Sequence, residues 1–158
     1  RQHDIEAWRD SMLQVCGLLD ATVGGESISL TLDENNRRTI YATVKRRDLE
    51  NVLKMFGFPE PTGHSPKREA VNTPLQQLYS LNSRFIWRCA TQLAQEITQD
   101  GESPNREIVE QLYQRVFSRS VGPEELELGV VFLESVDEDA LRRYIHALLI
   151  SNEFAFLD

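Results

Sequence analysis

The apolar residues of positions 73–97 recur at steps of three and four, the period of one continuous helical stripe. A strong helix start opens this stretch, because Thr73 can cap the helix, Pro74 suits its first position, and Gln76 can reach back to the Thr73 amide. One polar residue, Asn82, interrupts the stripe, and a polar side chain there needs the backbone partners that a helix break supplies. We therefore predict a short helix, a joint at Asn82 with its side chain buried and bonded to backbone, and then a longer helix.

The same spacing of apolar residues predicts further helices along the chain. They are expected at 4–19, 48–56, 103–117, 122–133 and 137–149. Two short runs that alternate apolar and polar residues, 28–32 and 39–44, flank a polar turn and predict a β-hairpin. Because a lone hairpin is only marginally stable, we expect it to lie on the helices. The predicted fold is mainly α, a compact multi-helix domain of six or seven helices with one small β-hairpin.

Length and composition are those of an ordinary globular domain. A chain of 158 residues favours a single domain over 1–158, and 41% hydrophobic and 27% charged residues are usual for this class. No apolar run approaches the roughly 20 residues of a membrane-spanning helix, so no membrane span is expected. The sequence starts abruptly, without Met, and we expect a C-terminal fragment of a larger multidomain protein.

Charge is distributed unevenly along the chain. Residues 1–98 hold 12 basic and 12 acidic side chains, whereas residues 99–158 hold 5 basic and 13 acidic ones. The net charge of −8 therefore arises in the second part. This acidity argues against nucleic acid as a partner.

Motifs of catalysis and metal binding are absent from the sequence. There is no GxSxG nucleophile elbow, no glycine-rich phosphate loop and no CxxC pattern, and His3, His64 and His146 lack neighbours at metal-ligand spacing. Acidic clusters at 124–127 and 137–139 resemble the paired carboxylates of glycosidases, but both stand at helix starts, where acids stabilise the helix dipole. We expect no metal site and no cofactor in this domain.

Two cysteines, Cys16 and Cys89, fall on apolar helix faces. This placement favours two separate buried thiols. A disulfide between the two helices is the alternative, since a sequence cannot place two sulfur atoms within bonding distance.

Basic residues gather around the predicted second strand and in the proline-rich loop 58–72. Such segments usually present binding residues, and arginine offers a planar fork for carboxylate or sulfate. The predicted working surface consists of Arg38, Tyr41, Arg46, Arg47, His64 and Arg68. Its expected partner is an acidic face of another domain of the same polypeptide, with an anionic glycan as the alternative. A solvated or salt-bridged strand edge would explain the same charges without binding.

Six fragments, in chain order, carry a resemblance to a known family. They are RDSMLQVCGLLDATVGG, RRTIYATVKRRDL, MFGFPEP, NTPLQQLYSLNSRFI, LYQRVFSRSVGPEEL and HALLISNEFAFLD. The chain resembles the C-terminal domain, of unknown function, of large planctomycete-type proteins that carry a cytochrome-c-like domain near their N-terminus. The resemblance implies a secreted or periplasmic parent protein with haem on another domain. No catalytic residues are established for the family, so none can be carried over.

Individual positions support the resemblance. Matching positions include Arg9-Asp10, Gly17, Arg38, Tyr41, Arg46, Arg115, Arg119, Glu125 and Asn152-Glu153-Phe154. Departures occur at Cys16, where the family often has Ser, at Gly57, where it usually has Asp, and at Arg84, where it often has Pro. The absent nucleophile and metal motifs and the resemblance together predict a non-catalytic binding or interdomain scaffold module of a larger exported protein. The alternative is part of a hydrolase acting on polysaccharide or sulfated glycan, with its site completed by other domains.

Overall fold

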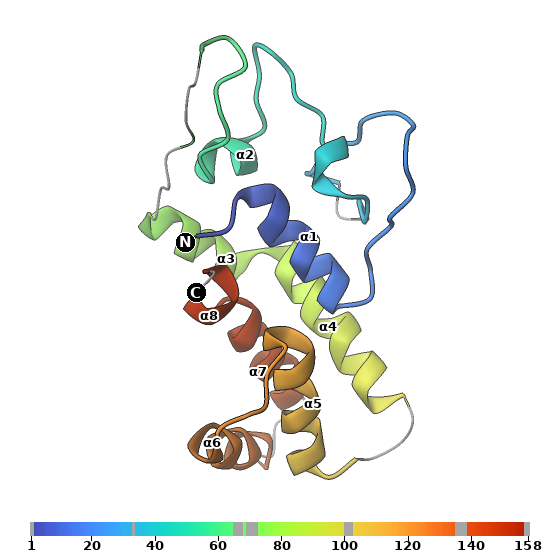
Figure 1. Cartoon of the computed structure of the whole chain (residues 1–158), viewed down its shortest axis with the longest axis vertical. Helices are drawn as coiled ribbons and strands as arrows, with labels where there is room; N and C mark the ends of the chain where they lie inside the picture. The colour runs from blue at the N-terminus through green and yellow to red at the C-terminus, as the bar shows by residue number, and fades with distance from the viewer. Residues whose placement is uncertain are drawn as a thin grey trace.

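The computed structural model describes residues 2–32, 34–64, 68, 73–99, 103–134 and 139–156. Within these ranges the chain forms eight α-helices, six of them at least seven residues long, and one short 3₁₀ helix, η1 (Figure 1). The elements are α1 (Ile5–Val15), η1 (Thr39–Tyr41), α2 (Asn51–Met55), α3 (Pro74–Asn82), α4 (Arg84–Thr98), α5 (Asn105–Phe117), α6 (Pro123–Leu133), α7 (Ala140–Leu149) and α8 (Asn152–Ala155). The predicted mainly α fold is confirmed.

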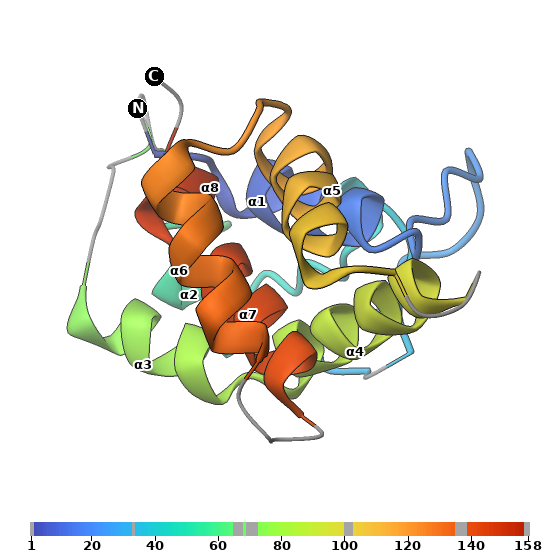
Figure 2. The ribbon, with the colours of Figure 1, turned by 90° about the horizontal axis from the view of Figure 1, so that it is seen from below.

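Helix α4 joins the N-terminal and C-terminal parts of the hydrophobic core. It packs against α1 and, more extensively, against α7, which in turn contacts α5 and α6 (Figures 1 and 2). Its inner face is fully buried and consists of Ile86, Cys89, Ala90 and Leu93. Burial of one Leu or Ile side chain contributes about 1.5–3 kcal/mol, so this face is a main source of stability. The two ends of the chain also meet, because the His3 amide donates to the Ala155 carbonyl oxygen, 3.0 Å away.

The start of α3 has the predicted cap. The Thr73 hydroxyl accepts from the Gln76 amide at 3.3 Å, and Gln76 Oε1 accepts from the Thr73 amide at 3.0 Å. Both bonds satisfy amides that have no partner within the helix. The Gln76 Nε2 donates to the Met55 carbonyl oxygen at 2.8 Å, which ties α3 to the end of α2.

Helix α3 ends at Asn82 and α4 begins at Arg84, so the predicted joint is confirmed. The prediction that Asn82 is buried is wrong, because its side chain is exposed and donates to the Leu78 carbonyl oxygen at 2.9 Å. Ser83 is the buried residue of the joint. The rotation of α3 explains the difference, since the helix turns Gln76 inward and its leucines outward. The exposed leucines are Leu75, Leu78 and Leu81.

The predicted β-hairpin is also wrong. Segments 28–32 and 39–44 meet in a single parallel bridge between Ile28 and Ala42, and the described residues contain no strand. Residues 39–41 form η1 instead. The two segments therefore touch at one point, with the wrong relative direction for a hairpin.

Side chains of α1 explain why these segments do not pair as strands. Arg9 is only 4% exposed, and its guanidinium donates to the carbonyl oxygens of Asn35 and of Arg37, the latter at 2.9 Å. Arg9 also donates to the Thr39 hydroxyl at 3.2 Å, while Asp10 accepts from the Thr39 amide at 2.7 Å. Side chains of α1 thus bind the first amide of the segment 39–44 and two carbonyl oxygens of the chain that leads into it.

The two cysteines are free thiols, as predicted, and both are fully buried. Cys16 stands at the end of α1 and Cys89 on α4, and the two thiols contact each other across the interface of these helices. A hydrogen bond from Cys16 to Cys89 and burial together raise the pKa of Cys16. The same hydrogen bond lowers the pKa of Cys89, but burial keeps both sulfur atoms away from reagents in solution.

Candidate functional site

A groove of about 820 Å³ opens between α1, the end of α5 and α8. Its charged lining consists of His3, Asp10, Arg38, Arg115, Arg119 and Glu153, and we call it the arginine groove. These residues come from distant parts of the chain, and the fold brings them together. Arg38 belongs to the predicted working surface, whereas the sequence analysis assigned no role to the other five.

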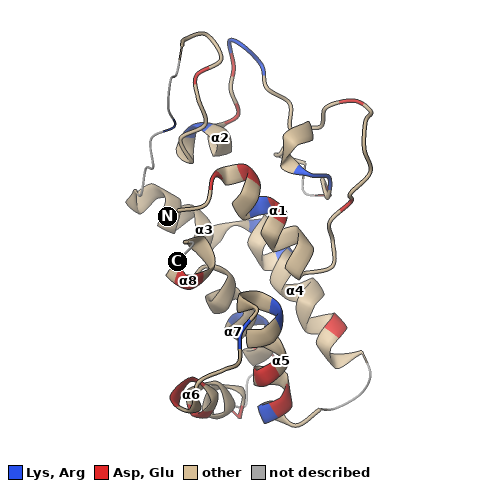
Figure 3. Cartoon of the chain, in the orientation of Figure 1, with Lys and Arg blue, Asp and Glu red and all other residues tan. Residues whose placement is uncertain are grey.

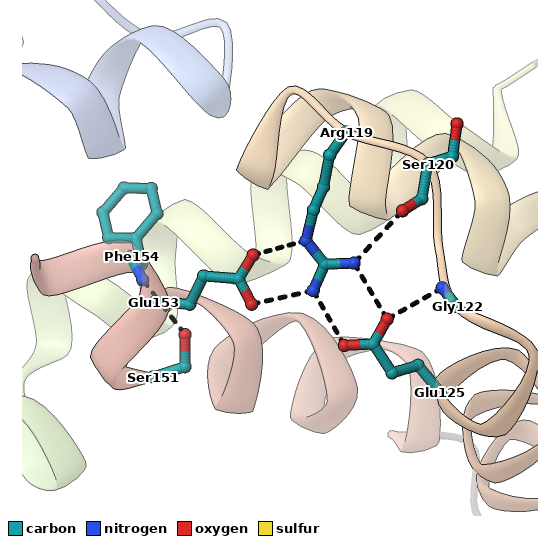
Figure 4. Close-up of polar contacts among 7 residues, drawn as sticks. All are labelled: Arg119, Ser120, Gly122, Glu125, Ser151, Glu153 and Phe154. Atoms are coloured by element: carbon teal, nitrogen blue, oxygen red, sulfur yellow. Dashed lines mark hydrogen bonds and ion pairs between the residues drawn. The ribbon is translucent and has the colours of Figure 1, made fainter. Parts of the chain in front are cut away.

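Arg119 is the most heavily bonded side chain of the arginine groove. Helix α5 ends at Ser118, whose left-handed φ of 57° turns the chain, and Arg119 follows directly. Its guanidinium contacts Glu153 at 2.5 and 2.8 Å and Glu125 at 2.7 and 2.9 Å (Figure 4). It also donates to the Ser120 carbonyl oxygen at 3.1 Å. Because all its donors are used, Arg119 clamps α5, α6 and α8 together and is not available to a ligand.

The clamp also shifts the ionisation of Glu125. Hydrogen bonds from Arg119 and from the Gly122 amide hold Glu125 in its charged form and lower its pKa to about 2. The two carboxylates raise the pKa of Arg119 in return. A carboxylate held in this way is a poor general acid, because acid catalysis needs a carboxyl with a raised pKa.

Arg115 joins the same end of α5 to α1 and α4. Its Nε donates to the Val15 carbonyl oxygen at 2.6 Å, and its Nη2 contacts Glu96 on α4. Glu96 in turn lies against Gly17, where a Cβ atom would come within 2.2 Å of Glu96 Oε1. Gly17 has a φ of 67°, so both the backbone and the close approach of Glu96 require glycine there.

Arg38 differs from the other two arginines of the groove. Its side chain is 54% exposed, and its Nε lies 3.5 Å from Asp10 Oδ2. Within the described residues its terminal nitrogens have no hydrogen bond. Arg38 is therefore the groove cation that an incoming acidic group can reach.

The other residues of the predicted surface do not form one cluster. Tyr41 accepts from the Gly24 amide at 2.9 Å and lies under Arg37, whose guanidinium is 4.1 Å from the ring centre. Arg68 forms a two-point ion pair with Glu6, at 2.7 Å for both bonds. Glu6 and Asp10 are one turn apart on α1, so Arg68 and Arg38 reach neighbouring turns of this helix. The remaining predicted residues, Arg46, Arg47 and His64, are exposed.

The sequence analysis missed Asp10, Arg115, Arg119, Glu125 and Glu153. Each lies in a fragment that carries the family resemblance, and Glu125 also stands three residues after Gly122, the spacing of a capping box. These signals could have identified the residues as candidates. They could not have shown that the residues lie close together in the fold. The ion pairs that join them span up to 34 residues of sequence.

A metal-binding cluster and a membrane-spanning helix are both absent from the part of the chain that the structure describes. No group of three or more His, Cys, Asp or Glu side chains there could hold a metal ion. None of its helices is long and apolar enough to cross a membrane.

Comparison with protein families yields one match. Residues 1–133 match the family model PSD1, a protein of unknown function (DUF1553). No curated protein and no solved structure matches the chain. The matched part ends with α6, although α7 and α8 complete the same hydrophobic core. Since the match covers most of its length, the chain belongs to this family of unknown function.

Proposed function

We propose that this chain is a non-catalytic binding module that holds neighbouring domains of a larger exported polypeptide together, one of them a cytochrome-c-like domain. The observation that carries the proposal is the contrast between paired and unpaired arginines. Arg115 and Arg119 are held by carboxylates of the same chain. Arg46 and Arg47 are exposed and form no ion pair among the described residues. Arg38, at the edge of the arginine groove, pairs with Asp10 through Nε only and is 54% exposed, so its other nitrogens can reach an acidic partner.

The state of the carboxylates supports binding over catalysis. Asp10, Glu125 and Glu153 each contact an arginine of the same chain, and the contact lowers the pKa of Glu125 to about 2. Glycoside hydrolysis needs one carboxyl kept protonated in an apolar pocket beside a second, charged one. The carboxylates of the arginine groove, Asp10 and Glu153, contact arginines of the same chain instead.

Apolar residues beside the free arginines favour a protein partner over a glycan. Ile40 is 71% exposed and Val44 is 45% exposed, in the same segment as Arg46 and Arg47. A sulfated glycan would satisfy the arginines and leave these apolar side chains in water. An acidic protein face with apolar residues at its centre would cover both.

Charge reversal tests the proposal. The double substitution Arg46→Glu and Arg47→Glu should leave the melting temperature of the isolated chain unchanged, because neither residue forms an ion pair among the described residues. The same variant should bind the remaining domains of the polypeptide, supplied separately, about tenfold or more weakly. Arg84→Glu, at an exposed position of α4, is the control and should bind as the wild type does.

Two results would contradict the proposal. One is unchanged binding of the double variant to the remaining domains. The other is salt-dependent binding of the isolated wild-type chain to sulfated polysaccharide that the double variant loses, which would assign the arginines to a glycan.

A further inference from the structure

A second groove, of about 770 Å³, lies between α5 and α6, and we call it the acidic groove. Apolar side chains of Val121, Leu126 and Val130 line it together with three carboxylates. These carboxylates are Glu110 on α5, Glu127 on α6 and Glu134 just after α6. Arg106 is the one basic residue in the lining, and Glu110 pairs with it at 3.2 Å. The groove therefore combines an apolar surface with a net negative charge.

The outer side of α6 extends this apolar surface. Leu128 is 72% exposed, Val131 is 61% exposed and Phe132 is 41% exposed. Val131 also lines the acidic groove, so the groove and the outer side are continuous. Residues 129–133 of α6 are all apolar, although the chain buries only one side of this helix. A helical turn that is apolar on all sides is normally covered on all sides, and an exposed apolar patch marks an interaction surface.

The negative charge around the acidic groove and the outer side of α6 limits which partners can bind there. Further acidic side chains, Glu107 and Glu124, are exposed on the same two helices, and Figure 3 shows acidic residues on both. Anionic lipids, nucleic acids and sulfated glycans are repelled by such a surface. A partner that brings lysine or arginine next to apolar side chains complements it.

We propose that the acidic groove binds a cationic amphipathic helix of another protein segment. Apolar side chains at i, i+3 or i+4, and i+7 of that helix enter the groove over Leu126, Val130 and Val131. Its flanking lysines or arginines pair with Glu127 and Glu134, which are seven residues, or two helical turns, apart. The length of α6, about 16 Å, matches a partner of about three turns. This surface is independent of the arginines of the proposed function.

A labelled model peptide tests the assignment. The probe is an amphipathic Lys/Leu helix of about three turns, and fluorescence anisotropy measures its binding to the whole chain. A peptide of the same composition, scrambled so that it has no apolar stripe, is the probe control. We expect the amphipathic peptide to bind in a salt-dependent way and the scrambled peptide to bind about tenfold or more weakly.

Substitutions in the chain locate the binding. Glu127→Lys with Glu134→Lys should weaken binding about tenfold or more, whereas Glu26→Lys with Glu60→Lys, at exposed acids elsewhere, changes it less than about twofold. Val131→Ser, in the groove lining, should also weaken binding, and Leu75→Ser, at an exposed leucine of α3, should not.

Three outcomes would overturn the proposal. They are no binding of the amphipathic peptide, equal binding of the scrambled peptide, and equal effects of the groove variants and their controls. All substituted side chains are exposed, so circular dichroism should show the fold unchanged in each. Arg46→Glu with Arg47→Glu should leave peptide binding intact, which separates this proposal from the proposed function.

Discussion

Residues 18–32 with 34–48, and the helices α4 to α7, are stabilised by different means. The helices bury continuous apolar faces against one another, as α4 does against α1 and α7. The described part of 18–48 has no strand and only the three-residue η1, and side chains hold its backbone. Arg9 and Asp10 of α1 and Arg37 within the segment supply half of the side-chain bonds to its described backbone. Apolar packing stabilises one region, and polar side chains bonded to backbone stabilise the other.

This difference determines how each region should respond to a destabilising substitution. Loss of a polar tether leaves buried carbonyl groups without donors and releases one segment. A substitution that disturbs the packing between helices should destabilise the whole core, because its residues pack as one cluster. Substitutions in the two regions should therefore separate local from global unfolding.

The largest effect is expected at Arg9. Arg9→Met keeps most of the side-chain volume but leaves the carbonyl oxygens of Asn35 and Arg37 without their donor. We expect a loss of about 2–4 kcal/mol, measured by chemical denaturation. Hydrogen exchange should accelerate within 20–44 while α5 and α6 stay protected. Equal acceleration in both regions would show that the segment is not a separately held unit. Arg84→Met, at an exposed arginine, should change stability little.

The next effect tests the helical region at Gly129. Alanine usually stabilises a helix by about 1 kcal/mol over glycine. Here a Cβ atom would come within 2.5 Å of Tyr144 Oη on α7 and 2.9 Å of Val109 Cγ2 on α5. Gly129→Ala should therefore destabilise the chain by about 1–3 kcal/mol and unfold all helices together. Gly63→Ala, where a Cβ atom meets nothing within 4 Å, is the control. A stabilised Gly129→Ala variant would contradict the close packing of these helices.

A smaller effect concerns the Arg119 clamp and pH. The folded pKa of Glu125, about 2, lies below its ordinary value of 4.5, so the clamp stabilises the fold above pH 4.5. This contribution should disappear as the pH falls from 4.5 towards 2. The side chain of Glu125 is 37% exposed, and solvent screening keeps the contribution near 1 kcal/mol. Glu125→Gln should remove this part of the pH dependence of stability. An unchanged acid profile in that variant would mean that the clamp contributes nothing.

The smallest effect is on thiol reactivity. Cys16 and Cys89 are buried and free, so a thiol reagent should modify neither in the native chain. Denaturation without a reductant should expose two thiols. Finding none would show a disulfide between α1 and α4 instead.

Predictions from the sequence succeeded where the cause is local. Thr73 and Gln76 form the predicted cap because both partners lie within one turn. Periodicity located the six long helices for the same reason, since each apolar face is a property of its own segment. The prediction that Asn82 is buried failed because it depends on how α3 is rotated about its axis. The bond from Gln76 to the Met55 carbonyl oxygen, 21 residues away, holds that rotation.

The prediction of a β-hairpin failed because of contacts that are also distant in sequence. The alternation in 28–32 and 39–44 is real, but Arg9 and Asp10 bind the backbone near Thr39 from about 30 residues away. The candidate site was predictable only in part. Arg38, Arg46 and Arg47 were found as basic surface residues, whereas Arg119 and its two carboxylates meet only through the arrangement of α5, α6 and α8.

Hydrogen exchange of the amides in 40–47 tests the proposed binding function most directly. It should be compared between the isolated chain and the same chain within the full-length polypeptide. We predict slower exchange in the full-length protein for this segment, because a neighbouring domain covers Ile40, Val44, Arg46 and Arg47, and unchanged exchange in α4, which is already buried in the core. Equal exchange of 40–47 in the two forms would contradict the proposal that this surface joins the chain to its neighbours.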